Sequence, residues 1–207
     1  MPYFKTLNIL YIHIPKTGGA NIENYFFFRS KTSPTIDNLL SYNKIPINLK
    51  INNHSLQHLT YKEIVNLQNF FKINFNNLRI FTAVRNPYNR IISDLIFLKL
   101  INKNDNKNKV KIEIEKYLNH ESDFDNHKTL QYNFILDENN NVDKKIIIIK
   151  TETLNQEMKN LGFPDFEKYC DNYKSNKDYY KYLNNEFIKL INSYYKKDFE
   201  YFNYKMF

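Results

Sequence analysis

The sequence predicts an α/β fold with a mainly parallel central sheet flanked by helices. Three short apolar runs, at residues 8–13, 79–84 and 145–149, have the length of buried strands. Each is followed by a segment with helical spacing of its apolar residues, and such alternation is typical of parallel sheets, which bind ligands at the carboxyl ends of their strands. With 207 residues, the chain is expected to form a single domain over residues 1–207.

The first predicted strand leads through a glycine turn to a helix over residues 22–29. A short helix at residues 36–41 is expected next, with a loop or an edge strand after it, because prolines interrupt this mixed segment. Thr60 with Glu63 three residues later has the pattern of a capping box ahead of apolar positions, which predicts a helix start. His58 then lies in the loop that leads to this helix.

The second predicted strand also ends in a loop and a helix, since Pro87 suits the first turn of a helix. The third strand is a run of isoleucines, which we expect to be central and buried on both faces. Residues 102–109 are polar and of low complexity, which predicts a mobile surface loop. Gly162 has the position of a C-terminal helix cap. Further helices are expected over residues 88–100, 110–118, 127–135, 153–161 and 178–199.

The composition is skewed toward Lys, Asn, Ile, Tyr and Phe, and the chain has only three glycines, two alanines and four arginines. Two of the glycines, both alanines and two of the arginines fall in just two segments, residues 12–21 and 81–93, which singles these segments out. The formal net charge of +8 and the pI near 9.2 favour a polyanionic partner, such as an acidic polysaccharide, a nucleotide or a nucleic acid. Lysines on a solvated surface would explain the same charge.

A single cysteine, Cys170, excludes an internal disulfide and argues against a disulfide-stapled secreted protein. We interpret it as a small buried hydrophobic residue. No apolar run reaches the roughly 20 residues that a membrane span needs, and the N-terminus lacks the organisation of a signal peptide. We therefore expect a cytoplasmic protein without a membrane span.

The segment Pro15-Lys16-Thr17-Gly18-Gly19 joins the first predicted strand to the first predicted helix. Glycines let the backbone turn sharply and approach a ligand, and the free N–H groups of a helix start favour a phosphate or a sulfate. The lysine precedes the glycines, so the segment is not a Walker A loop. Lys16 could place its ammonium beside the bridging oxygen of an anhydride, where negative charge grows as the leaving group departs. The plainer interpretation is a strand-to-helix turn with a solvent-exposed lysine.

A second constellation follows the second predicted strand. Arg85 at the strand end and Ser93 two turns into the next helix could converge on one phosphate, through a forked guanidinium and a hydroxyl donor. Arg90 is interpreted differently, because it can pair with Asp94 at i+4 as an ordinary helix salt bridge.

The chain carries three longer motifs, Ile-Pro-Lys-Thr-Gly-Gly, His-Leu-Thr-Tyr-Lys-Glu-Ile and Phe-Thr-Ala-Val-Arg-Asn-Pro-Tyr-Asn-Arg-Ile-Ile-Ser. In this order they resemble the carbohydrate sulfotransferases of the heparan sulfate 2-O-sulfotransferase type. Segments at residues 131–135, 150–154 and 194–204 are similar too, so the resemblance spans nearly the whole chain.

The resemblance implies a P-loop-like sulfotransferase fold. The implied donor is 3′-phosphoadenosine 5′-phosphosulfate (PAPS), whose sulfuryl group is transferred to a sugar hydroxyl, and no metal is implied. The acceptor is then a saccharide, for which the charge favours an acidic one, and no nucleic acid is expected as a partner. The implied ligands of the 3′-phosphate are Arg85 and Ser93. Those of the 5′-phosphosulfate are Lys16, Thr17, Gly18, Gly19, Ala20 and Asn21.

The sequence departs from the family pattern at two places. Ala20 and Asn21 stand where many relatives have a Ser or Thr that contacts the 5′-phosphate, so Thr17 and backbone N–H groups are expected to do that work. Lys150 stands where relatives often have Arg, which gives a point charge in place of a planar fork.

An acceptor hydroxyl needs a general base near neutral pH, and histidine suits this role by its pKa. His58, in the family-like segment, is the first choice, and His54 is the reserve. Their spacing of four would also suit two metal ligands on a helix, but no third ligand is evident. We interpret His13, inside the first strand, as a core or supporting residue, whereas His120 and His127 belong to no motif.

Two other functions remain open from the residues alone. One is a P-loop-like nucleotide or small-molecule kinase, although the Walker A order and a convincing Mg²⁺-binding aspartate after a strand are missing. The other is a non-catalytic binder of nucleic acid or acidic glycans, whose binding would fall steeply with salt. Aromatic residues interleaved with lysines near the C-terminus could supply stacking contacts for such a binder, but their helical spacing favours core packing.

Overall fold

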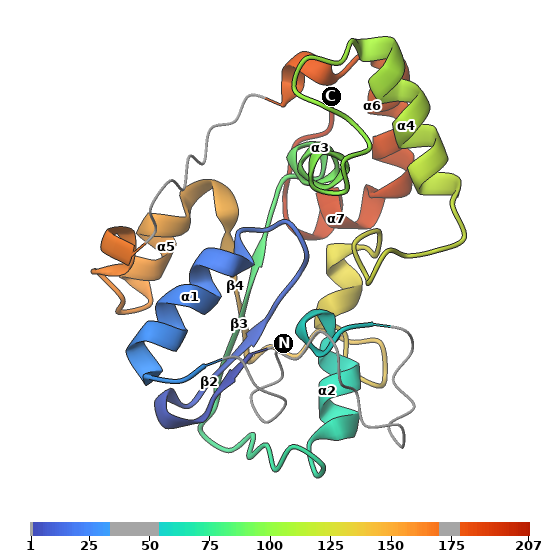
Figure 1. The fold of residues 1–207 in the computed structure, drawn as a ribbon. Coiled ribbons are helices and arrows are strands. Elements are labelled where there is room, and N and C mark those ends of the chain that lie inside the picture. The colour runs from blue at the N-terminus through green and yellow to red at the C-terminus, as the bar shows by residue number, and fades with distance from the viewer. Residues whose placement is uncertain (1, 34–53, 170–178) are drawn as a thin grey trace.

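A computed structural model describes residues 2–33, 54–169 and 179–207. In this part of the chain a four-stranded sheet has the order β1-β2-β3-β4, with β1 antiparallel to β2 and the other strands parallel (Figure 1). The predicted α/β fold with a mainly parallel sheet and flanking helices is confirmed. The strands are β1 (Tyr3–Phe4), β2 (Ile9–Ile12), β3 (Arg79–Val84) and β4 (Ile146–Lys150).

Helices cover both faces of the sheet and its carboxyl edge. Helices α1 and α5 lie on one face and α2 on the other, while α3, α4, α6 and α7 gather beyond the carboxyl ends of the strands (Figure 1). Short 3-10 turns join several of these elements. The α-helices are α1 (Gly19–Ser30), α2 (Tyr61–Leu67), α3 (Pro87–Phe97), α4 (Lys107–Asn119), α5 (Leu154–Asn160), α6 (Asn185–Tyr194) and α7 (Lys196–Tyr201). The 3-10 turns are η1 (Lys5–Leu7), η3 (Leu56–His58), η4 (Gln131–Ile135), η5 (Thr151–Thr153), η6 (Phe166–Tyr169) and η7 (Tyr180–Tyr182).

Period-two alternation along the strands divides the core between the two faces of the sheet. On β2, Ile9 and Tyr11 pack with α1 and α5, whereas Leu10 and Ile12 pack with α2 and the segment that precedes β4. A third apolar cluster lies within the helices beyond the carboxyl ends of the strands. The loops that leave β2 and β3 are therefore held between the sheet and this helical cluster.

Three local predictions are confirmed residue by residue. The capping box at α2 is present, with Thr60 and Glu63 each bonded to the backbone N–H of the other. Pro87 is the first residue of α3. Gly162 follows the end of α5 with φ of +90°, a left-handed conformation that favours glycine.

Strand β4 is not buried on both faces as predicted. Among the described strands it lies at the edge of the sheet, where it pairs with β3. The side chain of Ile147 is consequently 38% exposed.

Predicted and observed helices differ most in three places, and α3 also ends at Phe97, three residues before its predicted end. The predicted helix over residues 178–199 is divided at Tyr195, whose φ of −100° and ψ of 22° turn the chain so that Phe199 packs against Tyr88. In the segment 127–135 only a 3-10 turn from Gln131 onward is formed. The predicted loop at 102–109 ends early, because α4 already begins at Lys107.

The predicted short helix at residues 36–41 and Cys170 lie outside the described residues. Within the described ranges, no helix combines the length and the apolar character that crossing a bilayer requires.

Candidate active site

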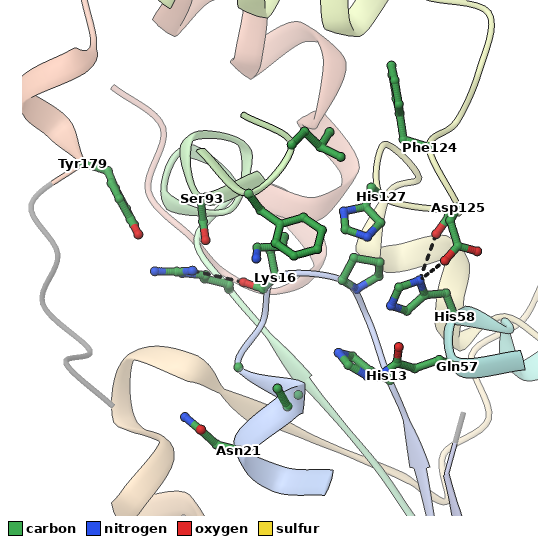
Figure 2. A pocket seen from close by; sticks show the side chains of 17 residues that line it. His13, Lys16, Asn21, Gln57, His58, Ser93, Phe124, Asp125, His127 and Tyr179 are labelled. Carbon is green, nitrogen blue, oxygen red and sulfur yellow. Dashed lines mark hydrogen bonds and ion pairs between the residues drawn. The ribbon is translucent and has the colours of Figure 1, made fainter. Parts of the chain in front are cut away.

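A pocket of about 660 Å³ opens at the carboxyl ends of β2 and β3 (Figure 2). Its walls come from the turn between β2 and α1, the 3-10 turn η3, helix α3 and the turn at residues 124–127. Most of the predicted site residues line it. They are Lys16, Gly18, Gly19, Ala20, Asn21, His58, Arg85 and Ser93.

The glycine turn fits the start of α1 against the pocket. Gly18 is the N-cap with φ of +87°, and Lys16 also has a positive φ, of 65°. A Cβ atom at Gly19 would lie 2.2 Å from Nε2 of His13, so any larger residue there would have to displace the ring or the helix start. Gly18 has no side chain that could accept from the first turn of α1, which leaves the N–H groups at this helix start suited to an anion.

Thr17 supports the turn from behind and is not among the pocket-lining residues, which corrects the expectation that its hydroxyl contacts an anion. The side chain is fully buried, and its hydroxyl donates to the carbonyl of Ile14 at 2.8 Å. The carbonyl of Thr17 in turn accepts from the hydroxyl of Thr151 at 2.6 Å, which ties the turn to the end of β4. Thr17 therefore shapes the turn, whereas Lys16, Gly18 and Gly19 line the pocket.

Lys16 and Arg85 bring two positive charges to one side of the pocket. The Arg85 guanidinium donates to the carbonyl oxygen of Lys16 at 3.1 Å and lies 5.3 Å from the ring of Tyr179. The Lys16 ammonium lies 4.0 Å from the ring centre of Phe97 on α3. Ser93 lines the pocket from the same helix, so cationic and hydroxyl groups from two strand ends face one space.

The backbone of Arg85 is fixed by the side chain of Gln131. Its N–H donates to Oε1 of Gln131 and its carbonyl accepts from Nε2, both at 2.8 Å. Gln131 is held by the buried carboxyl group of Asp198, which accepts from the Gln131 N–H at 2.9 Å. Burial raises the pKa of Asp198, although Arg90 and these N–H groups oppose the rise.

Arg90 does not form the predicted salt bridge with Asp94. Its buried guanidinium donates instead to the carbonyls of Pro15 at 3.1 Å, Thr129 at 2.9 Å and His127 at 2.7 Å. A buried guanidinium needs several acceptors, and the carbonyls of two neighbouring loops supply them. Arg90 thus joins the glycine turn to the loop of His127.

His58 projects from η3 and is held by Asp125. Nδ1 of His58 lies 2.7 Å from Oδ2 of Asp125 and 3.1 Å from the Asp125 carbonyl oxygen. The same carboxylate accepts from the N–H of Ser55 at 2.5 Å and from its hydroxyl at 2.8 Å. Burial would raise the pKa of Asp125, but the bonds from His58 and Ser55 outweigh it and leave the pKa below its usual value.

The carboxylate fixes which nitrogen of His58 faces a ligand. An ionised carboxylate only accepts, so Nδ1 of His58 carries the hydrogen and Nε2 keeps its lone pair. Burial lowers the pKa of His58 to about 4, although Asp125 opposes the shift. The ring is therefore neutral at pH 7, with the lone pair of Nε2 unprotonated.

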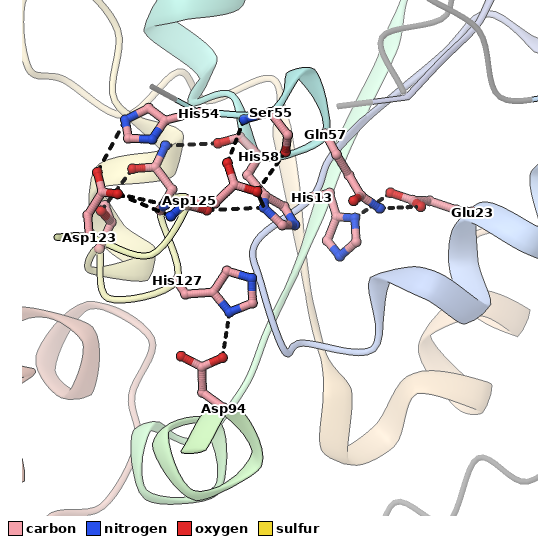
Figure 3. Close-up of polar contacts among 12 residues, drawn as sticks. His13, Glu23, His54, Ser55, Gln57, His58, Asp94, Asp123, Asp125 and His127 are labelled. Atoms are coloured by element: carbon pink, nitrogen blue, oxygen red, sulfur yellow. Dashed lines mark hydrogen bonds and ion pairs between the residues drawn. The ribbon is translucent and has the colours of Figure 1, made fainter. Parts of the chain in front are cut away.

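His54 is separated from the pocket that His58 lines. It is buried, its Nε2 lies 3.4 Å from Oδ2 of Asp123, and it is absent from the pocket lining (Figure 3). His120 is exposed and likewise outside the pocket.

Two further histidines, neither of them predicted as a site residue, also line the pocket. His13 lies just beyond β2, and its Nδ1 contacts Glu23, whose other oxygen accepts from the Gln57 amide at 2.7 Å. His127 contacts Asp94 through Nδ1 at 2.5 Å. The rings form a row with His58 in the middle, 5.2 Å from His13 and 5.1 Å from His127 between ring centres (Figure 3).

Asp125 and His127 come from a left-handed turn of the backbone. Phe124, Asp125 and Asn126 have φ of 53°, 61° and 64° in succession, which is costly for residues with a Cβ atom. Asp123 stabilises the turn by accepting from the N–H of Asp125 at 3.1 Å. In the part of the chain that the structure describes, no three His, Cys, Asp or Glu side chains are arranged to hold a metal ion.

Comparison with known proteins gives one positive finding. The model of a protein family described as the sulfotransferase family matches residues 3–205. Neither the curated proteins nor the solved structures give a match.

Proposed function

The chain belongs to the sulfotransferase family, and from that premise we propose that it moves a sulfuryl group from PAPS to a hydroxyl group of a carbohydrate. The observation that carries the proposal is the content of one pocket. The pocket is lined by two cationic side chains, Lys16 and Arg85, and by the two glycines at the start of α1. It is also lined by His58, which is hydrogen-bonded to Asp125. A donor with phosphate at both ends and a hydroxyl that must lose a proton require these groups.

The residues suit the two ends of the donor. The backbone at Gly18 and Gly19, with Lys16, supports binding of the 5′-phosphosulfate, because helix N–H groups and an ammonium both favour an anion. Arg85 and Ser93 support binding of the 3′-phosphate through a fork of N–H donors and a hydroxyl. Both groups line the same pocket, so one molecule of donor can contact them together.

The reaction we propose is an in-line displacement at sulfur. The acceptor oxygen forms a bond to sulfur while the bond from sulfur to the bridging oxygen breaks, and its electrons pass to the departing 3′-phosphoadenosine 5′-phosphate. Lys16 stabilises the charge that grows on the bridging oxygen. The proton of the acceptor hydroxyl passes to Nε2 of His58.

Asp125 makes His58 suitable as the base. Its carboxylate holds the Nδ1–H tautomer and stabilises the imidazolium that forms when Nε2 takes the proton. Burial lowers the pKa of His58 to about 4, so the free ring is unprotonated throughout the neutral range, and Asp125 opposes the loss of basicity. His54 has no place in this mechanism because it does not line the pocket.

The carbohydrate acceptor rests on the resemblance of the motifs to sulfotransferases of the heparan sulfate 2-O-sulfotransferase type. The net charge of +8 supports an acidic saccharide as the acceptor.

The donor is tested by thermal unfolding with 3′-phosphoadenosine 5′-phosphate or with ATP and Mg²⁺. We expect a clear rise in Tm with the former and little with ATP, because only the former carries a 3′-phosphate. Equal stabilisation by both nucleotides, or consumption of ATP, would favour a kinase instead.

The chemistry is tested by transfer of labelled sulfate from PAPS to a panel of saccharides. Lys16→Ala and His58→Ala are expected to abolish transfer while the fold persists. Lys159→Ala and His120→Ala, at exposed positions outside the pocket, are the matched controls and should keep normal turnover. Near-normal turnover by both site variants would show that the assigned mechanism is wrong.

A further inference from the structure

We propose that His127 binds the hydroxyl group next to the one that receives sulfate, so that the acceptor carries two hydroxyls on neighbouring carbons. The inference rests on the proposed function and adds to it a substrate class, a vicinal diol, and a residue that recognises it.

The ring of His127 is fixed from three directions. Nδ1 contacts the buried carboxylate of Asp94 at 2.5 Å. Phe97 stacks on the ring with 5.5 Å between centres and an interplanar angle of 11°. The backbone carbonyl of His127 accepts from the Arg90 guanidinium at 2.7 Å.

Asp94 determines which ring nitrogen is left for a ligand. Its carboxylate also accepts from the hydroxyl of Tyr117. Burial would raise the pKa of Asp94, but the contacts with His127 and Tyr117 outweigh it and keep the pKa below its usual value. Nδ1 of His127 therefore donates to an ionised group. Among the described contacts none involves Nε2, and the residue lines the pocket.

His127 and His58 present this atom side by side. Their ring centres lie 5.1 Å apart with the planes at 80°, and each ring has its Nδ1 on a carboxylate (Figure 3). A hydrogen bond extends about 2.8 Å from each nitrogen, so two hydroxyls on adjacent carbons can reach both rings. One hydroxyl gives its proton to His58 during transfer, and the other stays bound to His127.

The chemistry of the ring favours a hydroxyl over an anionic group at this place. The lone pair of a neutral imidazole would repel a carboxylate or a sulfate, which only accept. A hydroxyl donates to the neutral ring and can also accept from a protonated one, so it fits either form. A buried network of His127, Asp94 and Tyr117 is costly unless every member is satisfied, and a ligand hydroxyl would satisfy the remaining nitrogen.

The test compares acceptors that differ by one hydroxyl, with labelled sulfate from PAPS as the donor. The probes are methyl pyranosides and their monodeoxy analogues, together with trans-1,2-cyclohexanediol and cyclohexanol. We expect the wild-type protein to prefer each diol over its mono-alcohol by about tenfold or more in kcat/KM, because the alcohol leaves the nitrogen without a partner. His127→Ala and His127→Gln should reduce this preference to within about twofold, and His120→Ala should keep it.

Several results would overturn the inference. Use of mono-alcohols as efficiently as diols by the wild-type protein would by itself overturn the inference. Full preference for diols in the His127 variants would overturn it too. Transfer to 4-nitrophenol but to no diol would overturn the diol while leaving sulfuryl transfer intact. Absence of both transfer and stabilisation by 3′-phosphoadenosine 5′-phosphate would overturn the proposed function together with this inference.

Discussion

A Cβ atom on residue 19 would lie 2.2 Å from Nε2 of His13, so glycine at the first position of α1 leaves the space that the ring of His13, just beyond β2, occupies. The contact fixes the start of the helix against a ring whose Nδ1 is held by Glu23 on the same helix. Glu23 also accepts from Gln57, the neighbour of His58. The proposed donor-binding turn and the proposed base are therefore parts of one packed arrangement.

Gly19→Ala is expected to weaken binding of 3′-phosphoadenosine 5′-phosphate about tenfold or more, because the methyl group must displace either His13 or the first turn of α1. Isothermal titration calorimetry measures the effect. The double variant His13→Ala/Gly19→Ala removes the clash and should recover part of the lost affinity. Gly162→Ala is the control: its φ of +90° makes it destabilising by about 1 kcal/mol, but no atom within 4 Å would meet its methyl group, and affinity should not change. Wild-type affinity in Gly19→Ala would contradict the role given to this contact.

Asp125→Asn is expected to lower kcat about 100-fold or more while the affinity for 3′-phosphoadenosine 5′-phosphate stays the same. The amide can donate to Nδ1 of His58 and so favour the wrong tautomer, and it no longer stabilises the imidazolium. Steady-state transfer of labelled sulfate gives kcat, and calorimetry gives the affinity. Asp123→Asn, which alters the neighbouring carboxylate at His54, is the matched comparison and should have the smaller effect. Equal losses in the two variants would argue against a specific role of Asp125.

The stability of the fold should depend on pH through His58. Its pKa is near 6.5 in an unfolded chain and is lowered to about 4 in the folded protein, mainly by burial. Between these values the unfolded chain binds a proton that the folded protein does not, so the free energy of unfolding falls as pH decreases from about 6.5 to 4. The loss attributable to this residue is up to about 3 kcal/mol. Urea unfolding across this range should show a flatter pH dependence for His58→Gln, and an unchanged one for His120→Gln.

The sequence was sufficient to predict the three parallel strands and the two cationic residues that line the pocket, because both follow from local patterns. Residues 79–84 form an apolar run bounded by polar residues, and β3 occupies the same residues. Lys16 and Arg85 were predicted because Lys16 lies in the glycine turn after one such run and Arg85 directly follows another, and parallel strands end at one edge of a sheet.

The partners of the histidines were beyond this reasoning. Asp125 is 67 residues from His58, in a polar stretch without a motif. It reaches the pocket only because three residues in succession adopt positive φ, and none of them is a glycine that would indicate such a turn. His127 follows the same turn. Only for His13 did the sequence indicate a place at the pocket, because it lies at the end of the first predicted strand, two residues before Pro15.

Two further errors come from a composition that is rich in isoleucine, tyrosine and phenylalanine. The isoleucines of β4 are typical of a strand buried on both faces, yet β4 lies at the edge of the described sheet. Helical spacing of apolar residues continues through Tyr195, where the helix is divided. The exposed side of β4 and the division of the helix at Tyr195 could therefore not be predicted from the pattern of apolar residues alone.

Arg85→Ala is expected to remove the preference for a 3′-phosphorylated nucleotide. The wild-type protein should bind 3′-phosphoadenosine 5′-phosphate about tenfold to a hundredfold more tightly than adenosine 5′-phosphate, because a guanidinium bond to phosphate is charge-assisted. Calorimetry with the two nucleotides measures the ratio in each variant. Arg79 is the matched control, since it lies at the opposite end of β3 and donates to the carbonyl of Leu161 at 2.7 Å. A preference that survives in Arg85→Ala, or that Arg79→Ala also removes, would refute the assignment.

Arg90→Lys is expected to lower the free energy of unfolding by about 2–4 kcal/mol even though the charge is kept. The planar guanidinium reaches the carbonyls of Pro15, His127 and Thr129 together, whereas a lysine ammonium cannot match this geometry and leaves buried acceptors unsatisfied. Urea unfolding of the two proteins measures the difference. Arg29→Lys, at an exposed pair with Asp165, should cost about 1 kcal/mol or less. Because Arg90 joins the glycine turn to the loop of His127, the variant should also lose affinity for 3′-phosphoadenosine 5′-phosphate at temperatures where it remains folded. Unchanged affinity and stability would show that these three hydrogen bonds do not hold the two loops together.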